Sequence, residues 1–200
     1  MLAGAGAASV IVVAGDGTTH ACLLASLTAL VFGDLARRAG RERGRQKGDP
    51  TDAATALSFL AVLTGAAFDV GRGSLDGDNA QLDAFAGVVV ILLGVGLREW
   101  SVRVLGASFA VRLGVADDHR LVDRGPYRWI RHPNYAALLM VALGTALALS
   151  SPVAAVATFT VWLPVTMLRV AREERLLLAH YGERYAGYRK RSWRLLPGVY

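Results

Sequence analysis

The chain has 200 residues, of which 54% are hydrophobic and 19% are charged, with a mean hydropathy of +0.38. Soluble domains carry about 25% charged residues, so this composition argues against a soluble protein and favours a membrane protein. The net charge of +6 and the isoelectric point near 10.0 could suit nucleic acid. However, the basic residues are confined to loops between apolar runs, without a basic and aromatic platform, so we expect no nucleic-acid partner.

Four or five apolar segments approach the length of membrane-spanning helices, which need roughly 20 apolar residues. They cover about Thr19–Leu35, Ala53–Val70, Leu82–Leu97, Tyr135–Leu149 and Pro152–Leu168. The run 2–14 is apolar but too short to span comfortably, so we expect an interfacial segment or an extension of the first helix. No positively charged region precedes this run, and we therefore expect no cleaved signal peptide.

Only Ser150, Ser151 and Pro152 separate the last two apolar segments, so these segments should form a tight helical hairpin. The sequence therefore predicts an all-α, polytopic membrane protein with about five transmembrane helices. We expect it to end in this hairpin and a cytoplasmic C-terminal helix, and to form a single membrane domain over residues 1–200.

Loop charge predicts the orientation, because Lys and Arg stay preferentially on the cytoplasmic side of a membrane. Segment 37–49 carries six basic and two acidic residues, segment 98–131 carries seven and four, and the tail from Arg169 carries eight and three. Segment 69–83 carries one basic and four acidic residues. Five spans with the N-terminus outside and the C-terminus in the cytoplasm satisfy every loop. The high Ala, Gly and Arg content is typical of a GC-rich bacterial genome, so we expect a bacterial inner membrane.

Polar residues gather on both sides of the hairpin. Because the hairpin reverses direction, segments 118–135 and 168–198 must meet at one cytoplasmic mouth. The polar side chains brought there are His119, Tyr127, Arg131, His132, Tyr135, Arg169, Glu173 and Glu174. Pro133 favours a helix start, where free N–H groups and the helix dipole attract an anionic group. Arg169 and Glu173 are spaced four apart; such a pair stabilises an exposed helix, but beside a membrane span and a second polar cluster it indicates a site.

Other polar and aromatic residues have simpler interpretations. Arginines next to spans usually determine topology, which is our interpretation of Arg124, Arg128, Arg172 and Arg175. Aromatic residues near a boundary are most often interface anchors, which is our interpretation of Trp129, Trp162 and Trp193. Cys22, the only cysteine in the sequence, should be a packed side chain. No His, Cys or Asp residues accompany His119 and His132 at the spacing of zinc ligands, so we expect no metal.

The segments HRLVDRGPYRWIRHPNY and REERLLLAHYGERYAGYRKRSWRLLP resemble the isoprenylcysteine carboxyl methyltransferase family. That family shares its C-terminal region with membrane phospholipid methyltransferases. The resemblance covers about His119–Pro197 and rests on the spacing G-x-Y-x-x-x-R-H-P-x-Y, the hairpin, the pair E-E and a downstream Y-G-x-x-Y-x-x-Y. It implies an S-adenosylmethionine-dependent methyltransferase, with N-terminal spans and loops in 1–111 and a cofactor-binding catalytic region in 112–200.

The resemblance also implies roles by position. It assigns cofactor contacts to His119, Arg120, Leu121, Val122, Tyr127, His132, Pro133, Asn134, Tyr135 and Glu173. It assigns Arg169 to the carboxylate of the methyl acceptor, which makes Arg169 and Glu173 the candidate catalytic residues. One position departs from the family, because Arg112 stands where a glutamine can occur.

Three functions remain open at this point. The first is carboxyl O-methylation of a lipophilic or lipid-modified acceptor, such as an isoprenylcysteine, which could enter from the bilayer between helices. The second is N-methylation of a phospholipid amine, for which Glu173 or Glu174 could remove the amine proton. The third is a non-catalytic membrane protein that retains the fold. The sequence indicates neither the natural acceptor nor the oligomeric state.

Overall fold

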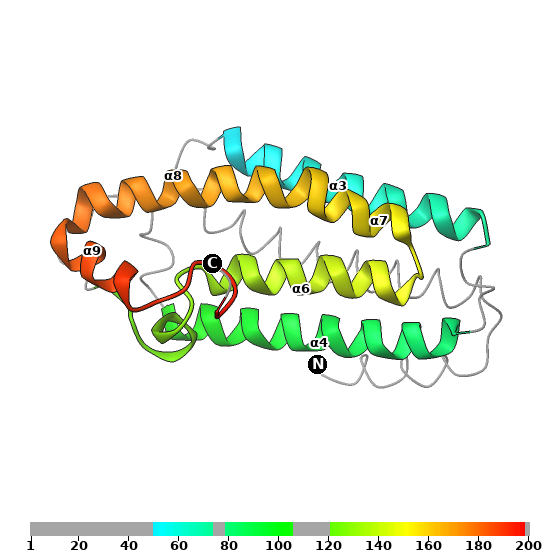
Figure 1. Ribbon diagram of the computed structural model, residues 1–200, viewed down its shortest axis with the longest axis horizontal. Coiled ribbons are helices and arrows are strands. Elements are labelled where there is room, and N and C mark those ends of the chain that lie inside the picture. The colour runs from blue at the N-terminus through cyan, green and yellow to red at the C-terminus, as the bar shows by residue number, and fades with distance from the viewer. Residues whose placement is uncertain (1–49, 74–78, 106–120, 199–200) are drawn as a thin grey trace, which may run out of the picture.

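The computed structural model describes residues 50–73, 79–105 and 121–198 (Figure 1). The predictions for the run 2–14, the first span, the basic loop 37–49, Arg112, His119 and Arg120 therefore lie outside the described residues. Within these three ranges the chain is helical, without strands and with one isolated parallel bridge between Ile130 and Trp193. The prediction of an all-α fold is confirmed.

Helices form where the sequence predicts the second to fifth spans. They are α3 (Pro50–Gly71), α4 (Ala80–Leu105), α6 (Pro133–Ala148) and a continuous helix made of α7 (Pro152–Ala157), η3 (Thr158–Trp162) and α8 (Leu163–Tyr181). A short α9 (Glu183–Lys190) follows. By length and composition, three stretches of the described residues could cross a membrane: Ala53–Gly71, Ala80–Leu105 and Pro152–Tyr181.

The predicted fourth span is shorter than the others. With 16 residues, α6 rises about 24 Å, which is less than the roughly 30 Å of a hydrocarbon core. It lies between α4 and the long helix α7–α8, antiparallel to the latter (Figure 1). Most of its side chains are buried, so α6 is the central helix of the bundle and the hairpin prediction is confirmed.

Glycines allow α4 and α6 to approach very closely. A Cβ atom at Gly87 would lie 2.3 Å from the backbone nitrogen of Ala148, and one at Gly94 would lie 2.8 Å from the carbonyl oxygen of Ala137. A Cβ atom at Gly144 would in turn lie 2.8 Å from the carbonyl oxygen of Gly87. Small residues of this kind are what membrane helices use to pack backbone against backbone.

The acidic ends of α3 and α4 meet the hairpin turn. The Oδ2 atom of Asp69 accepts hydrogen bonds from the Ser151 hydroxyl at 2.7 Å and from the Val153 N–H at 2.9 Å. The Ser150 hydroxyl lies 3.4 Å from Oδ2 of Asp83. Asp69 and Asp83, which flank the acidic loop 69–83, therefore lie at the same end of the bundle as the hairpin turn.

The long helix contains one wide turn. The N–H of Leu163 donates to the carbonyl oxygen of Thr158, five residues back, in a π-helical turn. Pro164 follows directly, and its missing N–H and its ring disfavour regular helical geometry in the preceding turn. Trp162, which ends the wide turn, is 1% exposed and packs edge-on against Phe59 at 6.3 Å. Its interpretation as an interface anchor is wrong, because this turn directs the ring into the core.

Candidate active site

The start of α6 is held by the C-terminal segment, defined here as Ser192–Leu195. The N–H of Arg131 donates to the carbonyl oxygen of Trp193 at 2.7 Å, and the N–H of His132 donates to that of Arg194 at 3.1 Å. The N–H of Trp193 donates back to the carbonyl oxygen of Trp129 at 2.7 Å. Residues 129–132 and 192–195 thus lie side by side at one end of the bundle.

His132 is the N-cap of α6 and Pro133 its first residue, as the sequence predicts. The carbonyl oxygen of His132 accepts from the N–H groups of Tyr135 at 3.0 Å and Ala136 at 3.1 Å, and the N–H of His132 is taken by the C-terminal segment. The helix start therefore offers fewer N–H groups to an anion than a four-donor terminus would. Recognition of an anion here must depend mainly on side chains.

Arg169, Tyr135 and Glu173 form a buried cluster where α8 passes α6. The Arg169 Nε atom donates to the Tyr135 hydroxyl, which donates to Oε1 of Glu173 at 2.5 Å. Arg169 Nε also lies 3.2 Å from the same carboxylate oxygen. Arg169 is 6% exposed and Tyr135 is 7% exposed. The predicted i, i+4 pair is present, and its position between two helices makes it more than a surface ion pair.

His132 lies between two carboxylates. Its Nδ1 atom is 3.6 Å from Oε2 of Glu173, and its Nε2 atom is 3.5 Å from Oε1 of Glu174. The imidazole is fully buried, and its ring centre lies 6.0 Å from that of Tyr135. Glu173 and Glu174 therefore lie against different nitrogens of the same imidazole ring.

Glu174 lies on α8, six residues beyond Leu168. Its carboxylate accepts from Arg131 Nε at 2.9 Å and from Arg194 Nη2 at 2.8 Å. His132 Nε2 also lies 3.5 Å from this carboxylate. Three nitrogen-bearing side chains therefore surround the Glu174 carboxylate.

Arg98 is a site neighbour that sequence reasoning missed. The third span was predicted to end at Leu97, but α4 continues to Leu105 and buries Arg98 to 6% exposure. Its Nη1 atom donates to the side-chain oxygen of Asn134. The signal was available, because Arg98 continues the buried stripe of Gly87, Ile91, Gly94, Arg98, Ser101 and Leu105 at steps of four and three.

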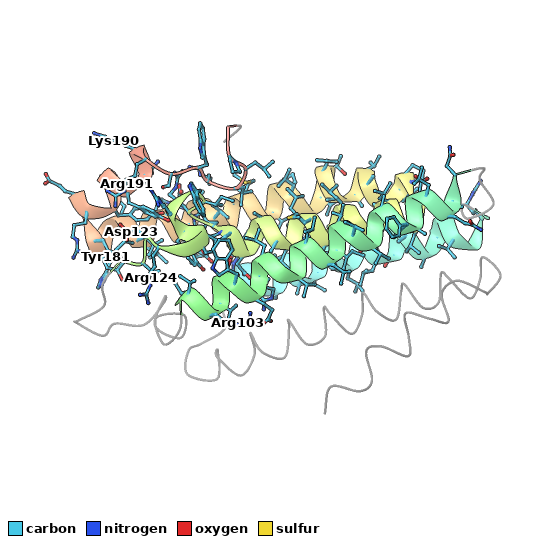
Figure 2. The ribbon with its side chains drawn as sticks, turned by 90° about the horizontal axis from the view of Figure 1, so that it is seen from below. Arg103, Asp123, Arg124, Tyr181, Lys190 and Arg191 are labelled. Atoms are coloured by element: carbon cyan, nitrogen blue, oxygen red, sulfur yellow. The ribbon has the colours of Figure 1, made fainter. Side chains whose placement is uncertain are left out.

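The other predicted residues lie around this cluster. Tyr127 is buried in η2 (Gly125–Arg128), and its carbonyl oxygen accepts from the Tyr188 hydroxyl at 2.6 Å. Leu121 and Val122 are half-buried, in the segment before η2. Figure 2 shows charged side chains at this end of the bundle. The arginines interpreted as topology determinants are all exposed: Arg124, Arg128, Arg172 and Arg175.

The cluster combines fixed cations, a carboxylate and aromatic rings at the end of an apolar hairpin. Arginine and imidazole can bind a carboxylate, Glu173 can bind an amine or hydroxyl, and an aromatic face can receive a cation. Among residues 50–73, 79–105 and 121–198, no group of three His, Cys, Asp or Glu side chains is arranged to hold a metal ion. The chemistry available is therefore recognition and orientation of small charged groups.

Comparison with known proteins agrees with these features. The model of the isoprenylcysteine carboxyl methyltransferase family matches residues 87–179, beginning within α4 and so upstream of the motifs. Over this region, a little under half of the chain, the protein is similar to this family. The apolar helices and this similarity together indicate an integral membrane protein.

The alignments with individual relatives cover only part of each relative's length. A probable protein-S-isoprenylcysteine O-methyltransferase of Oryza sativa subsp. indica is 32% identical over 118 residues, which are 58% of this chain and 62% of the rice protein. The protein-S-isoprenylcysteine O-methyltransferase of Rattus norvegicus is 34% identical over 117 residues, which are 57% of this chain and 41% of the rat protein. The chain thus spans less than two thirds of either relative.

The fold agrees with a solved member of the family. The structure of the eukaryotic intramembrane Ras methyltransferase ICMT matches with a TM-score of 0.55 and 25% sequence identity. The match covers 78% of this chain and 55% of that one. The helical arrangement described above is therefore similar to that of this eukaryotic methyltransferase.

Proposed function

We propose that this chain is an S-adenosylmethionine-dependent methyltransferase that methylates the carboxylate of a lipophilic, isoprenylcysteine-like acceptor. The observation that carries the proposal is the buried cluster of Arg169, Tyr135 and Glu173 within the region shared with the methyltransferase family. An arginine fixed at the end of an apolar hairpin suits an acceptor that has a charged head and an apolar body.

The residues present fit S-adenosylmethionine, which supplies an electrophilic methyl group when bound. Its carboxylate suits His132 and Asn134 at the start of α6. Its amine or ribose hydroxyls suit Glu173, and its sulfonium suits the ring of Tyr135. Leu121, Val122, Tyr127 and Pro133 are the further candidates for cofactor contacts among the described residues. The cofactor contacts of His119 and Arg120, which lie outside the described residues, stay predictions from the resemblance.

Arg169 would orient the acceptor. Methyl transfer is an in-line displacement, so catalysis depends on holding the nucleophile, the methyl carbon and the sulfur in a row. A carboxylate is ionised at neutral pH and needs no general base. Because Arg169 already shares its charge with Glu173 at 3.2 Å, it can hold an acceptor carboxylate without quenching its nucleophilicity.

We further propose the topology that loop charge predicts, with the N-terminus outside and the site and C-terminus in the cytoplasm of a bacterial inner membrane. In support, the basic tail and the site share one end of the bundle, whereas Asp69 and Asp83 lie with the hairpin turn at the other. In a Cys22→Ser background, the Ser150→Cys variant should react with a membrane-impermeant maleimide added to spheroplasts. The Arg175→Cys variant in the same background should react only after lysis, and the reverse pattern would overturn this topology.

A methyl-transfer assay tests the function. The purified protein in detergent would receive S-adenosylmethionine labelled in its methyl group, together with an S-farnesylcysteine analogue, a fatty acid or phosphatidylethanolamine. We expect label on the farnesylcysteine analogue, released as methanol by base because the product is an ester. Base-stable label on phosphatidylethanolamine would instead establish N-methylation. Protein that binds no S-adenosylmethionine, although monodisperse, would exclude both enzymatic functions.

A further inference from the structure

Glu174 has a set of partners that the proposed function does not use. Its Oε1 atom contacts Arg131 Nε at 2.9 Å and His132 Nε2 at 3.5 Å, and its Oε2 atom contacts Arg194 Nη2 at 2.8 Å. The carboxylate is 4% exposed. One buried group on α8 thereby joins the segment that precedes α6 and the C-terminal segment.

Such a group is not explained by stability alone. Removing a carboxylate and its guanidinium partners from water is costly, and apolar residues of similar volume often stabilise a protein at least as well. The arrangement must therefore be judged by what it positions. Arg131 also donates to the backbone oxygen of Ser192 and, at 3.1 Å, to that of Arg189 near the end of α9. Arg131 and Arg194 therefore attach the end of α9 and the chain that follows it to Glu174.

The group positioned is the imidazole of His132. Glu173 contacts one ring nitrogen and Glu174 the other, so the ring cannot turn without losing one carboxylate. The backbone of His132 is held by the same neighbours, because its N–H donates to the carbonyl oxygen of Arg194 at 3.1 Å. Ring plane and backbone are thus both set from the side opposite Glu173.

From this geometry, and resting on the proposed function, we propose that Glu174 is a positioning residue of the cofactor site. It fixes the imidazole of His132 against Glu173, and through Arg194 it holds the C-terminal segment as the wall behind the start of α6. Glu174 acts through His132 and does not touch the bound cofactor. The C-terminal segment is therefore part of the binding site, and its Leu195 packs in one buried cluster with Tyr135 and Val170.

The test compares cofactor affinity in the full-length protein. Isothermal titration of S-adenosylmethionine would be performed on the wild type, Glu174→Gln and Asp123→Asn. The Asp123 control removes a 2.7 Å ion pair with Arg191 that also joins the segment before α6 to the chain after α9, but both side chains of this pair are exposed. We expect roughly a tenfold or greater loss for Glu174→Gln, as when partners that orient ligands from behind are removed, and an unchanged affinity for Asp123→Asn.

A double-mutant cycle separates positioning from general destabilisation. If Glu174 acts through His132, adding Glu174→Gln to His132→Ala should cause no further loss of affinity, whereas independent effects would add. Additive losses would overturn the proposal. Should Glu174→Gln not fold, Arg194→Gln replaces it in the cycle, because Arg131 then still pairs with Glu174.

The controls keep the two proposals distinguishable. Wild type that binds S-adenosylmethionine with the same affinity as folded Glu174→Gln would overturn the positioning role and leave the methyltransferase function standing. Folded wild type that binds no S-adenosylmethionine would overturn the methyltransferase function and the positioning role together.

Discussion

The contact between α4 and α6 can be tested by adding a single methyl group. In Gly87→Ala, the new Cβ atom would lie 2.3 Å from the backbone nitrogen of Ala148 and 2.5 Å from both its Cα and Cβ atoms. None of these atoms belongs to a flexible side chain. The two helices must therefore separate by about 1 Å at this point to restore ordinary van der Waals contact.

The expected cost follows from this displacement. Overpacking of a close contact typically costs about 1–3 kcal/mol, and for a chain of this size each kcal/mol lowers Tm by about 2–4 °C. We therefore expect Gly87→Ala to melt about 2–12 °C below the wild type. Gly96→Ala is the matched control in the same helix, since a Cβ atom there meets nothing within 4 Å and alanine favours a helix by up to about 1 kcal/mol.

Thermal unfolding of the purified proteins in one detergent, followed by intrinsic tryptophan fluorescence, would measure these shifts. Gly96→Ala should melt at or above the wild-type temperature. If Gly87→Ala melts together with the wild type and Gly96→Ala, the two backbones are not in contact at Gly87 and the packing argument fails.

Two further predictions concern the two ends of the bundle. Arg169→Ala should lower methyl transfer at least about a hundredfold while S-adenosylmethionine affinity by titration stays within about twofold; equal losses in both would assign Arg169 to the cofactor. Asp69→Ala removes the acceptor for the Ser151 hydroxyl and the Val153 N–H, so it should lower Tm by an amount corresponding to about 1–2 kcal/mol without changing cofactor affinity, and an affinity loss would contradict its structural role.

The topology of the described residues follows from local features of the sequence. Apolar length predicts the helices, and the three-residue link at Ser150 forces α6 and the long helix to run antiparallel. That reversal is also what brings His132 and Arg169 together, since both lie at the same end of the hairpin. A site formed by the two ends of one hairpin can be predicted from the sequence, because only the position of one turn has to be predicted correctly.

The missed features depend on contacts between segments that are distant in sequence. Arg98 meets Asn134 only because α4 and α6 pack in one register, and a run that ends in charged residues hides the extra two turns of α4. The partners of Glu174 include Arg194, which lies in a segment without regular structure. Hydrophobic periodicity cannot predict such a segment, because its backbone pairs with residues 129–132 and with no helix.

The wide turn before Pro164 also affects how relatives of this protein should be aligned. The buried positions 154, 158, 162, 166, 170 and 174 of the long helix recur every four residues, whereas a regular helix would rotate each step by about 40°. The π-helical turn takes up one additional residue and so removes about 100° of that rotation. A relative that lacks one residue between Thr158 and Trp162 would therefore present its equivalents of Arg169 and Glu173 in the same direction. A single-residue gap elsewhere in this helix would turn both away by about 100°, so the position of a gap determines whether the two residues are preserved in space.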